Sequence, residues 1–150
     1  VGLLTGAVAG LATITPAAGY VSLTTAVVIG ILAGGVCYFA VALKNRAGWD
    51  DALDVWGVHG VGGFLGICLL GVFASKAWNS AGADGLWLGG VGFFGKQVAA
   101  AIVCSAWAFA FTYGMLWLIS RITLTKVDRA AEERGLDAEL HGEVAYPLAV

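Results

Sequence analysis

Charged residues are missing from three long stretches of the chain, and this pattern predicts membrane-spanning helices. No Asp, Glu, Lys or Arg occurs in residues 1–43, 55–75 or 97–120. About 20 consecutive apolar residues cross the hydrocarbon core of a bilayer as an α-helix. The first stretch is interrupted at 15–19, with the sequence TPAAG, because proline and glycine end helices. We therefore predict helices over the apolar segments 2–14, 22–43, 52–74 and 86–120.

The polar segments divide the chain into two regions. Residues 44–48 should form a short polar loop, and the longest predicted helix exceeds what an untilted crossing requires. After that helix, residues 121–150 are polar and charged. We expect this tail to begin as a helix that stops at Gly135, since glycine is common just after helix ends. Transmembrane helices are expected before it, over residues 1–120.

Composition supports a membrane protein and argues against several functions. Hydrophobic residues make up 59% of the 150 residues, charged residues make up 12%, and the mean hydropathy is +0.86. Soluble domains carry about 25% charged residues. The net charge of −2 offers no basic surface for nucleic acid. Cys37, Cys68 and Cys104 lie inside apolar runs and should be small buried hydrophobes, so we expect no metal and no cofactor.

Basic residues predict the orientation of the helices. Lys44 and Arg46 follow the second predicted helix, and four more basic residues lie in the tail. Two further crossings separate these segments, so they lie on the same side of the membrane. Basic segments next to membrane helices remain in the cytoplasm. We expect a multi-pass protein of the cell membrane with a cytoplasmic C-terminus.

The chain begins inside an apolar segment. Val1 leads directly into the predicted helix over 2–14, without the basic region or cleavage site of a signal peptide. We expect this sequence to be a portion of a longer protein.

Glycine recurs at four-residue spacing along the predicted helices. The sets are Gly2, Gly6 and Gly10; Gly30 and Gly34; Gly62 and Gly66; Gly85 and Gly89. Small residues at this spacing let helix backbones approach closely in lipid. Together they predict a compact helical bundle, although each single pair is interpreted as generic packing.

His59 is the candidate for chemistry inside the membrane. An ionisable side chain within a membrane helix is costly and is by default a functional candidate. Its neighbours on the same helix face are Val55, Gly62 and Gly63, which leave one side apolar and the other open. A neutral imidazole offers one hydrogen-bond donor and one acceptor. For a lone membrane histidine, a structural hydrogen bond and a functional role are both open, and the surrounding motif favours function.

Three motifs occur in order along the chain. They are GAVAGLATITPAAGY at 6–20, DDALDVWGVHG at 50–60 and GLDAELHGEVAY at 135–146. With these motifs the chain resembles the ammonium transporter family, which includes the methylammonium permeases and, more distantly, the Rhesus proteins. The third motif is similar to the ammonium transporter and methylammonium permease branch. The resemblance covers essentially the whole chain.

The resemblance implies an all-α membrane protein with an inverted repeat. The family has eleven helices, five in each of two halves of opposite topology and a long eleventh. This chain would supply the end of the eighth helix and the ninth, tenth and eleventh helices. The family forms homotrimers in which each subunit has its own pore.

The resemblance also implies transport of ammonium or methylammonium. In the family, ammonium loses a proton and passes through a hydrophobic pore lined by two histidines, and His59 matches the second of them. The implied pore residues are His59, Val55, Thr15 and Val8. Asp51 and Asp54 would lie at the cytoplasmic mouth. Electroneutral passage and net charge movement both remain open.

For the tail, the resemblance implies coupling between subunits and regulation. The residues concerned are Gly135, Asp137, His141, Gly142, Glu143 and Tyr146. In some relatives this face receives the PII signalling protein.

The residues alone also suggest roles for other charged positions. Asp50, Asp51 and Asp54 begin a helix, where carboxylates are favoured. We assign the helix cap to Asp50, whereas Asp54 could equally shape the mouth of the pore. Arg129 and Glu133 should form a weak surface pair.

Two other classes of protein stay open. One is an ammonium sensor on the same scaffold, which a fused signalling domain would favour. The other is a small helical membrane protein with a structural role, against which the three ordered motifs argue. No enzyme signature occurs, so we do not expect an enzyme. Because the family's first pore histidine is not in this chain, we expect that the chain alone does not enclose a pore.

Overall fold

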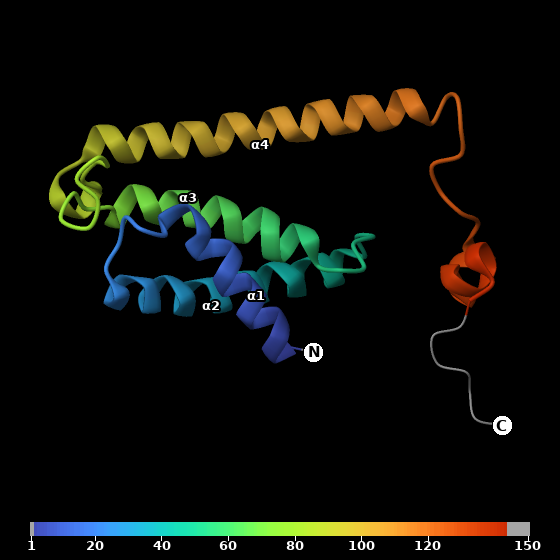
Figure 1. Ribbon diagram of the computed structural model, residues 1–150. Helices are drawn as coiled ribbons and strands as arrows, with labels where there is room; N and C mark the ends of the chain where they lie inside the picture. Colours follow the sequence, from blue (N-terminus) through green and yellow to red (C-terminus); the bar gives the residue numbers. More distant parts are fainter. Residues whose placement is uncertain (1, 144–150) are drawn as a thin grey trace. The chain divides into compact units, whose positions relative to one another are not determined.

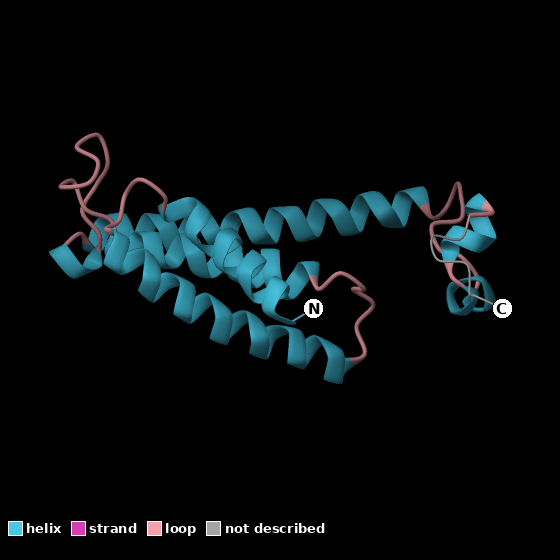
Figure 2. Ribbon diagram, turned by 60° about the horizontal axis from the view of Figure 1, so that its bottom comes forward, coloured by secondary structure: helices cyan, strands magenta, loops and turns pink. Residues whose placement is uncertain are grey.

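The computed structural model describes residues 2–143, and within this range the chain is helical with no strand (Figure 2). Three segments are long and apolar enough to cross a membrane: Leu23–Ala47, Trp56–Phe73 and Val91–Ile119. The predicted all-α membrane fold is therefore confirmed. The helices are α1 (Gly2–Ile14), α2 (Leu23–Ala47), α3 (Val61–Phe73), α4 (Val91–Ile119) and α5 (Arg129–Arg134), with short helical turns η1 (Thr15–Ala17), η2 (Trp56–Gly60), η3 (Leu86–Leu88) and η4 (Asp137–His141).

The chain separates into two compact units, one up to Ser105 and one from Ala106 onward. In the first unit, α2 runs alongside α3, and α1 crosses both (Figure 1). Their shared core is a cluster of small buried side chains, Ala9, Cys37 and Val58, with Val41 packed against it. This cluster joins α1 and α2 to η2, the turn that leads into α3.

Glycines on α3 make the closest of these contacts. A Cβ on Gly62 would lie 2.9 Å from Thr13 Oγ1 and 3.2 Å from Cys37 Sγ. A Cβ on Gly66 would meet the carbonyl oxygen of Thr13. The predicted role of the Gly62 and Gly66 pair in close packing is thus confirmed.

The other glycine sets behave differently. A Cβ on Gly2, Gly6, Gly10, Gly30 or Gly34 would meet no atom within 4 Å, so packing within the described residues does not require glycine at these positions. The helical spacing predicted for Gly85 and Gly89 is wrong. They flank the turn η3, and Gly89 has a φ of 86°, which glycine adopts without strain.

The break between the first two helices is confirmed. Helix α1 ends in η1, which contains Pro16, and Gly19 then takes a φ of 83°. Ser22 caps α2, since its Oγ accepts a hydrogen bond of 3.1 Å from the backbone N–H of Thr25. These residues set the boundaries that the sequence indicated.

The predicted polar loop at 44–48 is mostly wrong. Helix α2 continues to Ala47, and Gly48 ends it with a φ of 66°. Lys44 lies in the last helical turn and is buried. Hydropathy alone predicts a loop here because charged residues usually lie outside membrane helices.

At the other end of the unit, the loop between α3 and α4 packs onto the break after α1. The backbone N–H of Ser75 donates to the carbonyl of Tyr20 over 3.0 Å. Asp84 closes the loop by accepting from the backbone N–H of Lys76 over 2.9 Å. The predicted helix 86–120 is divided here, because the left-handed Gly89 separates η3 from α4.

The second unit holds the end of α4 and the tail. The tail does not begin as a helix; α5 begins at Arg129 after the cap Asp128, whose Oδ1 accepts from the N–H of Ala131 over 2.8 Å. Helix α5 stops at Gly135, as predicted. The predicted pair of Arg129 and Glu133 is confirmed at 3.0 Å, and both side chains are exposed.

Candidate functional site around His59

A π-helical turn, η2, carries His59 at the start of the second membrane-spanning segment, Trp56–Phe73. The turn begins where the Asp51 carboxylate accepts hydrogen bonds from the N–H groups of Val55 and Trp56, each over 2.9 Å. This satisfies two of the free donors at a helix start. The cap assigned to Asp50 is therefore wrong, and Asp51 is the capping residue. Turns of this π type are frequent at functional sites.

His59 opens onto an apolar groove shared with α1. A cavity of about 310 Å³ is lined by Leu4, Thr5, Val8, Leu53, Val58 and His59. His59 itself is exposed in this chain. The structure thus brings together two of the predicted pore residues, His59 and Val8, from segments that are far apart in the sequence.

The other two predicted pore residues lie outside this cavity. Val55 is exposed and precedes His59 by one helical turn. Thr15 is also exposed, and its hydroxyl donates to the carbonyl of Leu11 over 2.6 Å. Because Thr15 follows Val8 by seven residues, both lie on the same face of the helical segment.

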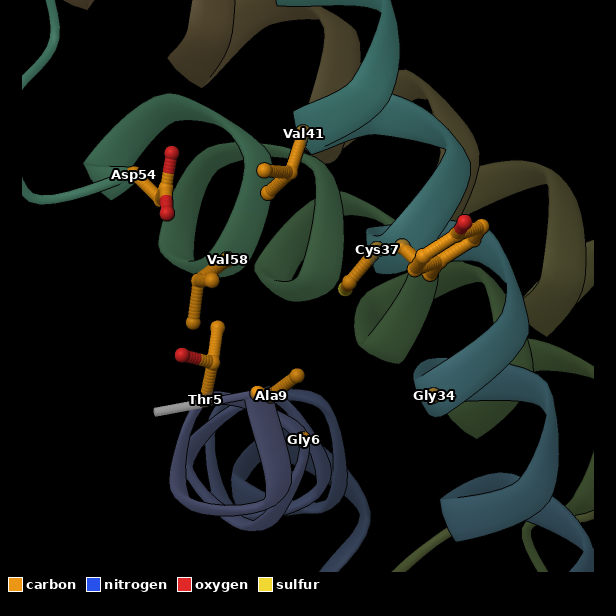
Figure 3. A pocket seen from close by; sticks show the side chains of 10 residues that line it. Thr5, Gly6, Ala9, Gly34, Cys37, Val41, Asp54 and Val58 are labelled. Atoms are coloured by element: carbon orange, nitrogen blue, oxygen red, sulfur yellow. The ribbon is translucent and has the colours of Figure 1, made fainter.

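A second cavity lies between α1, α2 and η2, with a volume of about 340 Å³. Figure 3 shows the Asp54 side chain at one end of it, beside Val41 and Val58, with Cys37 on the opposite side. His59 does not line this cavity. Asp54, predicted at the cytoplasmic mouth of the pore that His59 would line, therefore lines a different cavity, although both cavities share Thr5 and Val58.

A buried ion pair holds Asp54 in place. Lys44 Nζ lies 2.7 Å from Asp54 Oδ1 and donates a second hydrogen bond of 2.6 Å to the carbonyl oxygen of Asp51. The Lys44 side chain is 6% exposed. Sequence reasoning missed this pair. Its signal was a lysine at the end of one apolar segment and an aspartate at the start of the next.

Two tryptophans lie beside this ion pair. Trp49 follows the end of α2 and Trp56 opens η2, and their rings meet edge to face with centroids 4.9 Å apart. Both are partly exposed. Tryptophans of this kind are enriched at the interface between membrane and water, which agrees with a segment boundary at this end of the helices.

The tail residues of the predicted regulatory set form a compact local structure. Asp137 and His141 delimit η4, and Gly142 ends it with a φ of 67°. The N–H of Glu143 donates to the carbonyl of Asp137 over 3.2 Å. The chain thus folds back on itself just after Gly135. Tyr146, the last member of the set, lies outside the described residues.

The three cysteines differ in their burial. Within residues 2–143, no group of three or more His, Cys, Asp or Glu side chains is placed to hold a metal ion. Cys37 is buried and Cys68 partly buried, as expected of small hydrophobes, whereas Cys104 is exposed on α4. For Cys104 the expectation of burial is wrong within this chain.

Comparisons with known proteins agree on one family. A profile described as the Ammonium Transporter Family matches residues 1–146. An ammonium transporter of Bacillus subtilis is 42% identical over 97% of this chain and 36% of its own length. Ammonium transporter MEP2 of Saccharomyces cerevisiae is 41% identical over 97% of this chain and 31% of its own length. This chain spans about a third of the length of the curated relatives it matches.

Solved structures give the same result. A crystal structure of Candida albicans Mep2 superposes with a TM-score of 0.73 at 41% identity, covering 79% of this chain and 27% of that one. Saccharomyces cerevisiae Mep2 superposes with a TM-score of 0.72 at 36% identity, covering 87% of this chain and 30% of that one. The curated relatives named above are all described as transporters.

Proposed function

The chain belongs to the ammonium transporter family, and from this premise we propose that it forms part of the wall of an ammonium pathway across a membrane. His59 would be the polar group of that wall. Val8, Val55 and Thr15 would line the pathway above and below it. Asp51 and Asp54 would lie near its cytoplasmic mouth.

The observation that carries this proposal is the exposed imidazole in an apolar groove. His59 shares the cavity with Val8 and with other mostly apolar side chains from two segments. A bare ammonium ion would lose its hydration there at a high cost in free energy. Neutral ammonia needs only a donor and an acceptor, and a neutral imidazole offers one of each. The groove therefore suits ammonia better than the cation.

The groove is open on one side, which supports a pathway completed by further protein. Transporters built from inverted repeats place their substrate route between the two repeats. The relatives are about three times as long as this chain. We expect no saturable ammonium flux through liposomes that contain this chain alone, and clear saturable flux would overturn this part of the proposal.

The proposal includes a substrate and partners. Ammonium or methylammonium would be the substrate, and a homotrimer in the cell membrane would be the working form. Basic residues in the tail favour its placement in the cytoplasm. There Gly135, Asp137 and the segment up to Glu143 would couple subunits or receive the PII signalling protein.

Substitution of His59 in the full-length transporter tests the central claim. Uptake of labelled methylammonium by cells should fall strongly for His59→Ala, while the amount of assembled protein in the membrane stays the same. The matched control is Asn45→Ala, which removes an exposed polar side chain at the end of α2. Unchanged uptake with unchanged substrate selectivity for His59→Ala would remove the imidazole from the pathway.

A further inference from the structure

The buried pair of Lys44 and Asp54 joins the end of α2 to the start of the segment that carries His59. Lys44 Nζ contacts two oxygens, Asp54 Oδ1 at 2.7 Å and the Asp51 carbonyl at 2.6 Å. The lysine side chain is 6% exposed and the Asp54 side chain 30%. Surface ion pairs contribute little, whereas a charge buried to this degree requires its partner.

Asp54 has a special backbone conformation at this point. Its φ of 56° is the only positive value among the non-glycine residues that the structure describes. Aspartate and asparagine tolerate this left-handed region better than most residues do. The carbonyl of Asp54 also accepts a 2.9 Å hydrogen bond from the N–H of Val58, within the turn that holds His59. The conformation of Asp54 therefore sets where the helix begins.

Asp51 completes the arrangement. Its carboxylate accepts from the N–H groups of Val55 and Trp56, and its carbonyl accepts from Asp54 N–H over 3.3 Å as well as from Lys44. Lys44 thus contacts both residues that define the start of η2. A single ammonium group from α2 is therefore bound to both residues that precede the turn from which the imidazole extends.

We propose that Lys44 is a positioning residue for His59: its pairing with Asp54 sets the position of η2 and thereby of the imidazole in the groove. This inference rests on the proposed function, because it assigns the ion pair a role in the same pathway. The alternative role of the pair is to hold α2 against α3. That role is carried separately by the close contact of Gly62 on α3 with Cys37 on α2.

A double-mutant cycle in the full-length transporter tests the pairing. Lys44→Met and Asp54→Asn should each lower methylammonium uptake about tenfold, and adding the second substitution to the first should change uptake by less than about twofold. Asparagine tolerates the backbone conformation of Asp54, so this variant removes the charge without adding strain. Lys76→Met, at an exposed lysine on the other end of the unit, is the matched control and should leave uptake unchanged. Multiplying losses in the double variant would overturn the pairing.

Hydrogen exchange separates positioning from general stability. In both single variants of the assembled transporter, backbone exchange should increase in residues 55–60 and stay unchanged in residues 61–73. Faster exchange along both segments would show a purely structural role and overturn the proposal. If Lys44→Met fails to assemble, Asp54→Asn decides alone: unchanged uptake and unchanged exchange in 55–60 would also overturn it.

The His59→Ala variant keeps the two proposals apart. If uptake does not respond to His59→Ala, the pathway role of the imidazole fails. The exchange measurement still reports whether Lys44 fixes η2. If His59→Ala abolishes uptake but Lys44→Met leaves backbone hydrogen exchange in residues 55–60 unchanged, only the positioning role fails.

Discussion

Two cavities in the first unit share Thr5 and Val58 in their walls but differ in their polar groups. One contains His59 and is otherwise mostly apolar. The other contains Asp54, whose carboxylate is paired with a buried lysine. A neutral imidazole can face an apolar groove alone, whereas a carboxylate there needs a partner of opposite charge. The same packed helices thus line one cavity whose distinctive polar group is an exposed imidazole and one whose carboxylate is ion-paired.

If folding depends on the cavity that contains Asp54, Asp54→Ala should lower the unfolding free energy more than any of the other substitutions proposed below. It leaves the Lys44 ammonium buried without its partner and forces alanine into a left-handed backbone. We expect a loss of about 3–5 kcal/mol in the unfolding free energy of the full-length transporter. Thermal unfolding in detergent would measure it, and a midpoint equal to that of the unsubstituted protein would contradict the contrast.

Close packing of α3 against α1 and the turn η1 depends on Gly66. Its substitution by alanine would place a methyl group against the Thr13 carbonyl oxygen, which cannot move far within a helix. Gly66→Ala should lower the unfolding free energy by about 1–3 kcal/mol. The matched control is Gly63→Ala, where a Cβ meets nothing within 4 Å. Equal effects of the two substitutions, measured by the same unfolding experiment, would show that this contact is not close in the assembled transporter.

Val58 is buried in the wall common to both cavities, at 3% exposure. Val58→Ala would enlarge both and should cost about 1–2 kcal/mol of unfolding free energy. It should also change methylammonium uptake through the His59 groove. A loss of stability with fully normal uptake would indicate that the groove tolerates enlargement and is not a narrow passage.

The exposed pair in the tail gives the smallest expected effect. Arg129 and Glu133 are 3.0 Å apart, and their side chains are 90% and 69% exposed. Glu133→Gln should change the unfolding free energy by less than about 0.5 kcal/mol, because water and salt screen exposed pairs. An effect as large as that of Asp54→Ala in the same unfolding experiment would show that burial does not determine how much each ion pair contributes to stability.

Local chemistry explains which parts of the fold could be predicted from the sequence. Helix α1 has the predicted bounds because Pro16 and Gly19 interrupt the helix within a stretch that has no charged residue. The stop at Gly135 follows from the same glycine chemistry. Close packing at Gly62 and Gly66 was also predicted from spacing alone. Each of these features depends on residues within a few positions of one another.

The features that could not be predicted depend on contacts between distant segments or on backbone conformations that the residue types do not specify. Hydropathy placed Lys44 in a loop, since only the fold supplies the Asp54 carboxylate that allows its burial. The helical segment that carries His59 begins later than the predicted start at residue 52, because Asp51 caps it and Asp54 adopts a positive φ. The division of the segment 86–120 at Gly89 lies within an apolar run and leaves no charge signal. In the candidate site, the sequence predicted His59 and Val8. That Asp54 lines a different cavity follows only from the three-dimensional structure.

The left-handed backbone of Asp54 has a consequence for the mutational tolerance of this position. The residue at this position must adopt a left-handed backbone and must carry a negative charge for Lys44. Glycine and asparagine adopt a φ near 56° readily but have no charge. Glutamate keeps the carboxylate but lacks the preference for this backbone conformation. Aspartate alone meets both requirements. In a scan of all twenty amino acids, position 54 should therefore show three ranks: aspartate, then asparagine and glycine, then the remainder, with glutamate among the last despite its charge.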